Sequence, residues 1–463
     1  MAIRPCKVII SGGGITGLSL ALMLEKEGLD YVLLEAYPHI VSNKSGAGIC
    51  MLPNGLRILD QLGCYEDLLR LVGHPVDIIN VRNPQGESLS CTEEWHKRTS
   101  ERIPKLFELD NKANLNRYGY NPLWCHRHII LQVIYDQIQD KSKILTQKKV
   151  HTVQHTGNEV EVTTTDGYVY RGDMVIGADG VHSRIRQQMA QRASEVGISE
   201  QYTEENGEIS ALVPSTYCCL YGSSSNVSGI PKATLDFLLN KKFSYVIGSG
   251  HEDRVYWALM VKLQQTFHGS EIPRFSDQDM EKVIQEHWND PIAPGVNFSD
   301  LYNNRLSRTF LKPMREFIYK KWHLDRMMII GEAAHQMTIM IAQGGNQAIE
   351  SAAALTNSLK SALSGSTTAG RLSCQEIQCI FEEVQNIRSP RVKTIMERSH
   401  QRQLMDSMDT PELEELMLNK FPKMLPGVIV DRWDQTFRSA ISLQNFEISE
   451  RGKTSFWSDE QEK

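Results

Sequence analysis

The chain has 463 residues, which is too many for a single ordinary core, so we expect two or more domains. With 41% hydrophobic and 23% charged residues, the composition is that of a globular protein and excludes a disordered one. The formal net charge of -6 argues against a nucleic-acid partner. None of the nine cysteines forms a C-x-x-C pair, which argues against a metal site and favours reduced thiols in the cytoplasm. We see no signal peptide and no integral membrane segment, so the expected location is cytoplasmic.

The chain begins with the pattern of a β-α-β unit. An apolar run at residues 8–10 predicts a strand, residues 18–27 predict a helix, and residues 31–34 predict a second strand. The turn between the first strand and the helix carries three glycines in the spacing G-x-G-x-x-G. Between a strand and a helix, this spacing is typical of a turn that binds the pyrophosphate of a dinucleotide. A glycine-rich turn without a ligand is the alternative.

Each residue type in this turn has a physical role in holding a dinucleotide. Gly12 makes the tight turn, Gly14 lets the backbone approach a pyrophosphate, and Gly17 lets the helix pack closely on the strand. The free N–H groups and the dipole at the helix start favour phosphate there. Glu35, at the end of the second strand, is placed to accept hydrogen bonds from the hydroxyl groups of an adenosine ribose.

The next segments predict the surroundings of such a ligand. Residues 46–49 read as a loop or bulged strand over which a flat ring could lie, and residues 54–62 predict a helix. The charged, irregular residues 92–121 predict either a surface excursion or a lid over a pocket. An amphipathic helix follows from residue 126, with Arg127 in its first turn, where a positive charge opposes the helix dipole unless it meets an anion. Arg127 is therefore a candidate phosphate contact, and an arginine that simply reaches solvent is the alternative.

The middle of the chain is rich in β-structure. Residues 158–170 alternate as a hairpin around an Asp-Gly turn, and residues 174–176 predict another short strand. From about 200 to 322, runs of aromatic and β-branched residues predict a mostly antiparallel sheet in a second domain.

The last third of the chain is mainly helical. After a short buried strand at residues 327–330, residues 346–361 predict a helix. The pair Ser389-Pro390 predicts the N-terminus of another helix. The tail after Asn445 is polar, and we expect it to be frayed.

Three motifs stand in order along the chain: G-x-G-x-x-G from Gly12, G-A-D-G-x-x-S-x-I-R from Gly177, and G-E-A-A-H…Q-G-G-N from Gly331. This order resembles the class A flavin monooxygenases of the aromatic-hydroxylase type. The resemblance implies an α/β fold with a discontinuous Rossmann-type FAD-binding domain, an inserted, mostly antiparallel β-sheet substrate domain, and a C-terminal helical region. The corresponding ranges are 1–199 with 323–385, then 200–322, and finally 386–463.

Shorter matches at residues 52–59, 253–257 and 344–352 resemble the fungal epoxidases of indole-diterpene and meroterpenoid pathways. That resemblance implies FAD as cofactor and NADPH as a transient reductant. It implies epoxidation of a prenyl alkene or an indole 2,3-bond by a flavin C4a-hydroperoxide formed with O₂. The expected partner is a lipophilic small-molecule substrate: an indole alkaloid, an indole diterpene or a meroterpenoid.

The same resemblance assigns roles to individual residues. Arg127 falls where the family has a FAD-contacting arginine, and it is the one possible catalytic residue. Asp179 matches an aspartate that the family shares between FAD and NADPH, and Glu332 stands at the position that contacts the ribityl chain. Gly345 and Asn346 fall where a helix start faces the pyrimidine edge of the flavin, whose reduced form is anionic. The full set of expected cofactor-binding residues is Gly12, Gly14, Ile15, Thr16, Gly17, Glu35, Ala47, Gly48, Arg127, Asp179, Glu332, Gly345 and Asn346.

The third motif departs from the family pattern at three positions. Glu332 replaces an aspartate and is longer by one methylene, Ile339 replaces a proline, and Ala342 replaces a glycine and so restricts a positive φ. Three alternatives therefore stay open: a monooxygenase with a reshaped pocket, a FAD-binding but non-redox cyclase or isomerase, and a non-catalytic flavin- or ligand-binding protein. Within the first, phenol hydroxylation is the other possible reaction. The apolar residues 337–341 are either core packing or the lining of the substrate face, and we expect a structural role for His335.

Overall fold

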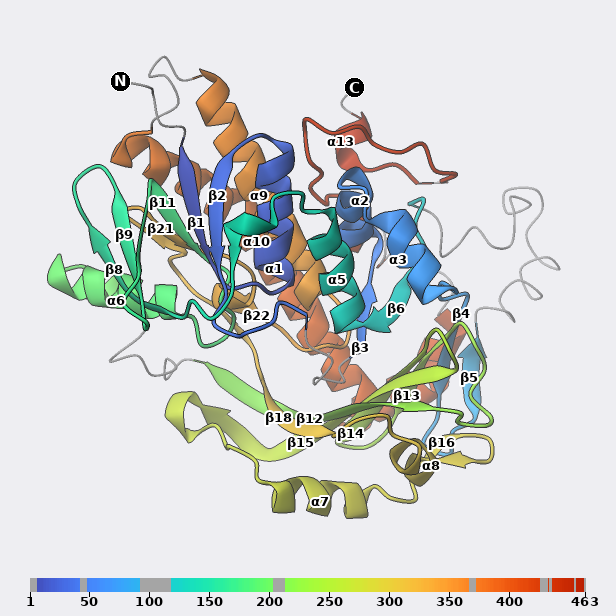
Figure 1. Ribbon diagram of the computed structural model, residues 1–463. Coiled ribbons are helices and arrows are strands. Elements are labelled where there is room, and N and C mark those ends of the chain that lie inside the picture. Colours follow the sequence, from blue (N-terminus) through green and yellow to red (C-terminus); the bar gives the residue numbers. More distant parts are fainter. Residues whose placement is uncertain are drawn as a thin grey trace.

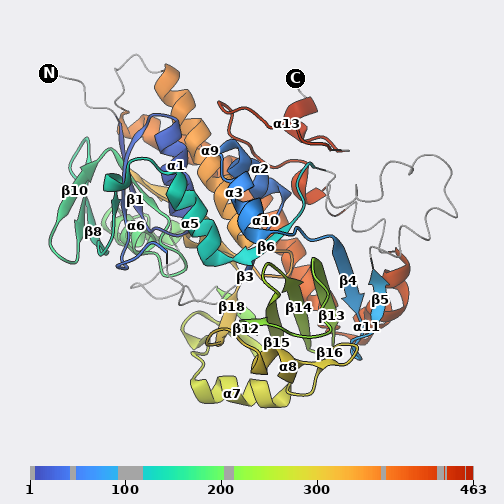
Figure 2. The same cartoon turned by 45° about the vertical axis from the view of Figure 1, so that its right-hand side comes forward.

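Two β-sheets, one mostly parallel and one mostly antiparallel, organise the chain (Figures 1 and 2). The computed structural model describes residues 6–41, 48–91, 118–202, 213–365, 372–424, 432, 435–453 and 455–461.

The first sheet has six strands in the order β20-β21-β11-β1-β2-β7, and all neighbours except β20 and β21 are parallel. Its strands are apolar because both faces are covered. In Figure 1, helices α1 and α9 lie on one side of this sheet and the three-stranded sheet β8–β10 lies on the other. The elements are β1 Lys7–Ser11, β2 Asp30–Leu34, β7 Ile144–Leu145, β11 Met174–Gly177, β20 His323–Leu324, β21 Met327–Ile329, α1 Ile15–Lys26, α9 Gly344–Gly365, β8 Val150–His155, β9 Val160–Thr164 and β10 Val169–Gly172.

The second sheet has seven strands in the order β18-β12-β15-β14-β13-β4-β5, and it is antiparallel except between β13 and β4. One face packs on α7 and α8 around a core that contains Trp257 and Phe298. The opposite face, which includes Met260 and Met314, turns towards the FAD-binding part. The strands are β4 Ile78–Arg82, β5 Ser88–Cys91, β12 Pro214–Ser225, β13 Thr234–Leu239, β14 Phe243–Ser249, β15 Arg254–His268 and β18 Phe310–Arg315.

The remaining elements connect these two layers. The longest is α10, Cys374–Asp406, which runs from the first sheet down to the second (Figure 2). The others are β3 Gly48–Met51, α2 Pro53–Gln61, α3 Tyr65–Val72, β6 Leu123–His126, α5 Arg127–Gln137, η1 Lys141–Lys143, α6 Arg184–Glu195, η2 Ser199–Gln201, η3 Gly269–Glu271, α7 Asp277–Glu286, β16 Pro291–Ala293, β17 Val296–Asn297, α8 Phe298–Asn303, β19 Phe317–Ile318, η4 Gly331–Ala333, β22 His335–Gln336, α11 Pro411–Glu415, η5 Leu416–Lys420 and α13 Ser458–Gln461.

This architecture confirms the predicted α/β fold with an added, mostly antiparallel sheet. The domain ranges stay a prediction, and two features of the structure bear on them. Strands β4 and β5 were assigned to the FAD-binding range, yet they extend the second sheet because β4 pairs with β13. Helix α10 runs without a break across the boundary at 385 and 386. Pro390 lies inside α10 and does not begin a helix, because Arg388, Val392 and Ile395 keep one buried face continuous around it.

The C-terminal tail was predicted to be frayed, and this prediction is wrong for the described residues. Trp457 is only 1% exposed and lies 4.5 Å from the guanidinium group of the fully buried Arg57. Arg57 also donates from Nη2 to Asp459 at 2.9 Å. The tail therefore closes over α2. Of residues 92–121, for which we predict either a surface excursion or a lid, residues 92–117 lie outside the described residues.

Candidate FAD site

Packing within the protein requires two of the three glycines in the turn after β1, but not the third. At Gly12, which has φ +104°, a Cβ atom would lie 2.5 Å from the carbonyl oxygen of Ala178, and at Gly17 it would lie 1.9 Å from the carbonyl oxygen of Gly12. Packing within the protein therefore requires glycine at both positions. At Gly14 the nearest atom to such a Cβ is Nη2 of Arg127 at 3.5 Å, which is an ordinary contact. Within the described residues, no other atom lies within 4 Å of that Cβ position, so packing does not require glycine at position 14.

The space beside Gly14 is lined by positive groups. Gly14 is the N-cap of α1, and no side chain caps its N–H groups, which include those of Ile15 and Thr16. Arg127 is the first residue of α5, and within the described residues its guanidinium group forms no hydrogen bond or ion pair. A helix start and an unpaired arginine that face one gap make an anion site suited to a pyrophosphate.

Glu332 lies close enough to Arg127 for their charges to interact. Burial raises the pKa of its carboxyl group, and the charge of Arg127 opposes that rise. The side chain of Glu332 is accessible to solvent. The structure thus brings Arg127 and Glu332 together with the α1 start, as expected of residues that meet one cofactor.

Glu35 is tied to the glycine turn. At the end of β2, its carboxylate accepts a hydrogen bond from Gly13 N at 2.6 Å and one from Tyr37 N at 2.8 Å. A carboxylate has about four lone-pair sites, so capacity remains for ribose hydroxyl groups. The assignment of Glu35 to the ribose stays a prediction.

Asp179 follows β11 and braces the start of α6. Its Oδ2 accepts hydrogen bonds from Arg184 N at 2.8 Å, Ile185 N at 3.2 Å and Ser11 Oγ at 3.3 Å. Burial raises the pKa of this carboxyl group. Among the described residues, its other oxygen, Oδ1, is buried without a hydrogen-bond partner, which leaves an acceptor for a cofactor hydroxyl or a bound water.

The start of α9 is held against the β3–α2 connection by one side chain. Asn346 accepts a hydrogen bond from Leu52 N at 3.0 Å and donates to the carbonyl groups of Cys50 at 3.1 Å and Ala342 at 2.6 Å. Its side-chain amide is therefore used within the protein, so only backbone N–H groups at Gly345 and Asn346 are left for a flavin. Ala342 has φ +51°, a backbone conformation that glycine adopts more readily than alanine.

A buried network that the sequence analysis missed lies below this helix start. Glu350 is fully buried and pairs with Arg388 at 2.6 Å and Arg391 at 2.7 Å. It also accepts a hydrogen bond from Asn54, whose amide pairs with that of Gln343. Residues 344–352 were recognised as a motif, but the two arginines carried no signal because the Ser-Pro pair between them was taken as a helix start.

The apolar residues after η4 divide between two roles. Met337 and Met340 are buried in the core, which is the packing alternative, while Ile339 is 38% exposed and can meet a ligand. His335 is 2% exposed, and burial together with Arg388 lowers its pKa to about 3, so it is neutral. Within the described residues its Nε2 has no hydrogen-bond partner, and a structural role for His335 stays a prediction.

Two further predicted positions contribute less to the site. Ala47 lies outside the described residues. At Gly48 a Cβ atom would lie 2.6 Å from the ring of Tyr256, so packing against the second sheet already requires glycine there.

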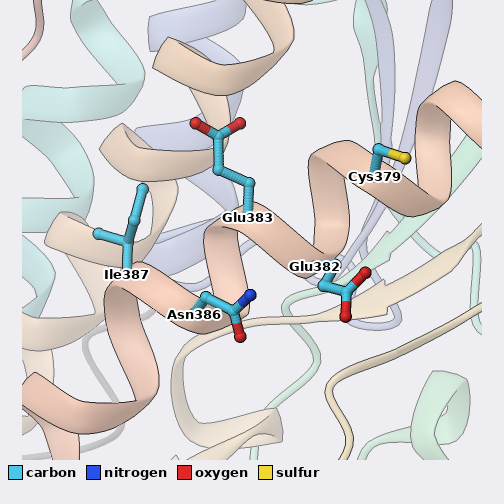
Figure 3. A pocket seen from close by; sticks show the side chains of 5 residues that line it. All are labelled: Cys379, Glu382, Glu383, Asn386 and Ile387. Atoms are coloured by element: carbon cyan, nitrogen blue, oxygen red, sulfur yellow. The ribbon is translucent and has the colours of Figure 1, made fainter.

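A hollow of about 510 Å³ on α10 contains none of the predicted residues (Figure 3). It is lined by Cys379, Glu382, Glu383, Asn386 and Ile387. Within the part of the chain that the structure describes, no cluster of side chains suits a metal ion, and no helix is long and apolar enough to cross a bilayer.

The groups around Gly14 fit FAD: an unfilled gap beside a helix start, an unpaired arginine, and acceptors for hydroxyl groups. The FAD binding domain family matches residues 5–380, most of the chain. The chain belongs to the class A FAD-dependent monooxygenases. This class A monooxygenase is 36% identical over 398 residues to the FAD-dependent monooxygenase spyC of Aspergillus fumigatus, with 85% of this chain and 78% of the relative covered. It is 31% identical over 447 residues to prhF of Penicillium brasilianum, with 96% and 88% covered.

Solved structures agree on the fold. The Klebsiella pneumoniae protein HpxO, complexed with FAD and uric acid, superposes with a TM-score of 0.70 over 93% of this chain and 96% of its own, at 19% identity. CtdE in complex with FAD and a substrate superposes with a TM-score of 0.65 over 93% and 99%, at 18% identity. At such identities the likeness concerns the fold alone.

Proposed function

We propose that this monooxygenase uses FAD, NADPH and O₂ to epoxidise an electron-rich C=C bond of a lipophilic, polycyclic secondary metabolite. The bond is a prenyl alkene or an indole 2,3-bond. The observation that carries the proposal is the apolar inner face of the second sheet, together with the loop that follows Glu332.

That inner face is aromatic, aliphatic and rich in sulfur. The buried cluster on this face includes Met340 from the loop, so the loop packs against the sheet there. Apolar surface of this kind favours a lipophilic ligand over a polar one. The buried members are Val76, Ile79, Tyr217, Cys219, Leu235, Val246, Ala258, Met260, Met314 and Met340, and partly buried Trp124, Tyr221, Phe237 and Leu404 pack against them.

The preference for epoxidation over phenol hydroxylation rests on the chemistry of the two reactions. Hydroxylation of a phenol needs a group that raises electron density in the ring, whereas an electron-rich alkene can be attacked without one. FAD, when bound, supplies the activation of O₂ and the transfer of one oxygen atom. The protein's part is to bind the cofactor at Gly14 and Arg127, to exclude water with its apolar face, and to hold the alkene close to the flavin.

One experiment that measures turnover separates this proposal from its alternatives. The purified protein with FAD is given NADPH, ¹⁸O₂ and a prenylated indole, and both NADPH consumption and product mass are followed. We expect NADPH oxidation that the substrate accelerates and one ¹⁸O atom in the product. A product isomeric with the substrate would select the cyclase or isomerase, and FAD binding without any product would select the non-catalytic protein.

The expected residue roles belong to the same proposal. Glu35 would hold the adenosine ribose, Glu332 the ribityl chain, and Asp179 both FAD and NADPH. Gly345 and Asn346 would face the flavin through their backbone N–H groups. The division into a FAD-binding domain, a substrate domain and a C-terminal helical region is proposed with β4 and β5 moved to the substrate domain.

A further inference from the structure

A compact, charged cluster lies inside the protein between α9 and α10. The carboxylate of Glu350 accepts hydrogen bonds from Arg388 Nη1 at 2.6 Å, from Arg391 Nε at 2.7 Å and from Arg391 Nη2 at 2.8 Å. Glu350 and Arg388 are fully buried, and the side chain of Arg391 is 11% exposed. Buried ions of this kind cost desolvation energy, and their mutual attraction does not repay it as a rule. A contribution to stability therefore does not by itself explain why the cluster is present.

The three side chains carry a net positive charge at neutral pH. Burial alone would raise the pKa of the Glu350 carboxyl group, but Arg391 and Arg388 more than offset it and lower the pKa to about 2. Burial lowers the pKa of Arg388 to about 10, which still leaves it protonated. The nearby His335 is neutral. One negative and two positive groups thus leave one surplus positive charge that water cannot screen.

The cluster is connected to the segment that we propose lies beneath the flavin. Glu350 is five residues beyond Gly345 on α9, which is about 8 Å along a helix axis. Asn54 joins Glu350 to Gln343 through hydrogen bonds of 2.6 and 3.0 Å, and Gln343 directly follows Ala342. The surplus charge therefore lies beside α9 near its start, and it acts in the same sense as the positive end of the α9 dipole.

We infer that the Glu350–Arg388–Arg391 cluster stabilises the reduced flavin and so raises the reduction potential of the bound FAD. Reduction by NADPH delivers a hydride, which is two electrons and one proton, and FAD becomes FADH⁻ while NADPH becomes NADP⁺. One negative charge develops on the flavin in this step, and a buried positive charge nearby favours it. Arg391 is thus a positioning residue that acts through the electric field at the helix start. The inference rests on the proposed placement of the flavin at that helix start.

The reduction potential of the FAD-loaded protein and its variants tests this inference by dye-linked reductive titration. A unit charge about 10 Å away at an effective dielectric constant near 20 changes the reduction equilibrium roughly tenfold, or about 30 mV for a two-electron couple. We expect Arg391→Gln to lower the potential by about that amount, and Arg391→Lys, which keeps the charge, to restore most of it. Glu350→Gln is expected to shift the potential in the opposite direction. Lys393→Gln removes the same charge from an exposed position on α10 and is expected to change nothing.

The direction in which each substitution shifts the reduction potential distinguishes an electrostatic effect from damage to the fold. A potential that falls alike in Arg391→Gln, Arg391→Lys and Glu350→Gln would overturn the inference in favour of a purely structural role. Unchanged potentials in all of them would overturn it as well. If Glu350→Gln fails to fold, the comparison of glutamine and lysine at position 391 still decides. If the variants show these shifts but the FAD-loaded wild-type protein oxidises no NADPH, the proposed function is refuted and this inference still stands.

Discussion

The substitution Gly14→Ala separates binding of FAD from folding of the protein. A methyl group at Gly14 meets only Nη2 of Arg127 at 3.5 Å, so the protein accommodates it without moving. Gly14 is the N-cap of α1, where alanine is less favourable than glycine, so the expected loss of stability is within about 1 kcal/mol. If the pyrophosphate of FAD passes over this residue, the same methyl group occupies its place.

The size of the effect follows from the contacts that are lost. Moving the pyrophosphate away from the helix start costs one or two charge-assisted hydrogen bonds, each worth about 1.5–3 kcal/mol. Because about 1.4 kcal/mol corresponds to a factor of ten, the dissociation constant for FAD is expected to rise at least ten- to hundredfold. Gly17→Ala provides the contrast, since its Cβ would lie 1.9 Å from the carbonyl oxygen of Gly12 and must push α1 away from β1. That overpacking is expected to destabilise the protein itself by about 1–3 kcal/mol or more.

Titration of the apoprotein with FAD, followed by flavin fluorescence, gives the dissociation constant, and thermal unfolding without FAD gives the stability. Gly14→Ala is expected to melt like the wild type and to bind FAD poorly, whereas Gly17→Ala is expected to melt earlier. Should Gly14→Ala bind FAD as tightly as the wild type, the gap beside Gly14 is not the pyrophosphate site and the reasoning from it is wrong.

Three further outcomes follow from the structure. Removal of residues 455–461 leaves the buried guanidinium group of Arg57 without its carboxylate partner, and we expect a loss of about 3–5 kcal/mol in a urea titration; an unchanged midpoint would mean that the tail does not close over α2. Ala342→Gly relieves a positive φ and is expected to raise the stability by about 0.5–1 kcal/mol, whereas a loss of stability would show that the strain is absent. The folded-state pKa of Glu350 is lowered to about 2, so its stabilising effect is present above its ordinary pKa and is lost as the pH falls towards 2. That loss is on the order of 3 kcal/mol in the wild type and is expected to be absent from Glu350→Gln, so identical acid unfolding of the two proteins would contradict it.

Those features of the fold and of the site that depend on local sequence signals could be predicted from the sequence. The glycine spacing after β1 determined the turn, because Gly12 and Gly17 have no room for a side chain. Ala342 was noted as a residue that restricts a positive φ where the family has glycine, and the structure has φ +51° there nonetheless. Alternating residues in β9 and β10 likewise predicted a hairpin, which the strand pairing confirms.

The parts that depend on distant partners were not predictable. The pairing of β4 with β13 joins segments more than 150 residues apart, so no local pattern revealed it. The Ser-Pro pair at residues 389–390 carries a helix-start signal, but burial of Arg388 against Glu350 keeps α10 continuous through it. The tail is polar in composition, and it packs because it meets distant partners such as Arg57, Asp60 and Tyr118.

The structure of the protein crystallised with FAD tests the central claim most directly. The account predicts the pyrophosphate between the start of α1 and Arg127, with the pyrimidine edge of the flavin facing the backbone N–H groups at Gly345 and Asn346. Density for FAD at another place, or crystals that stay colourless in excess FAD, would contradict it.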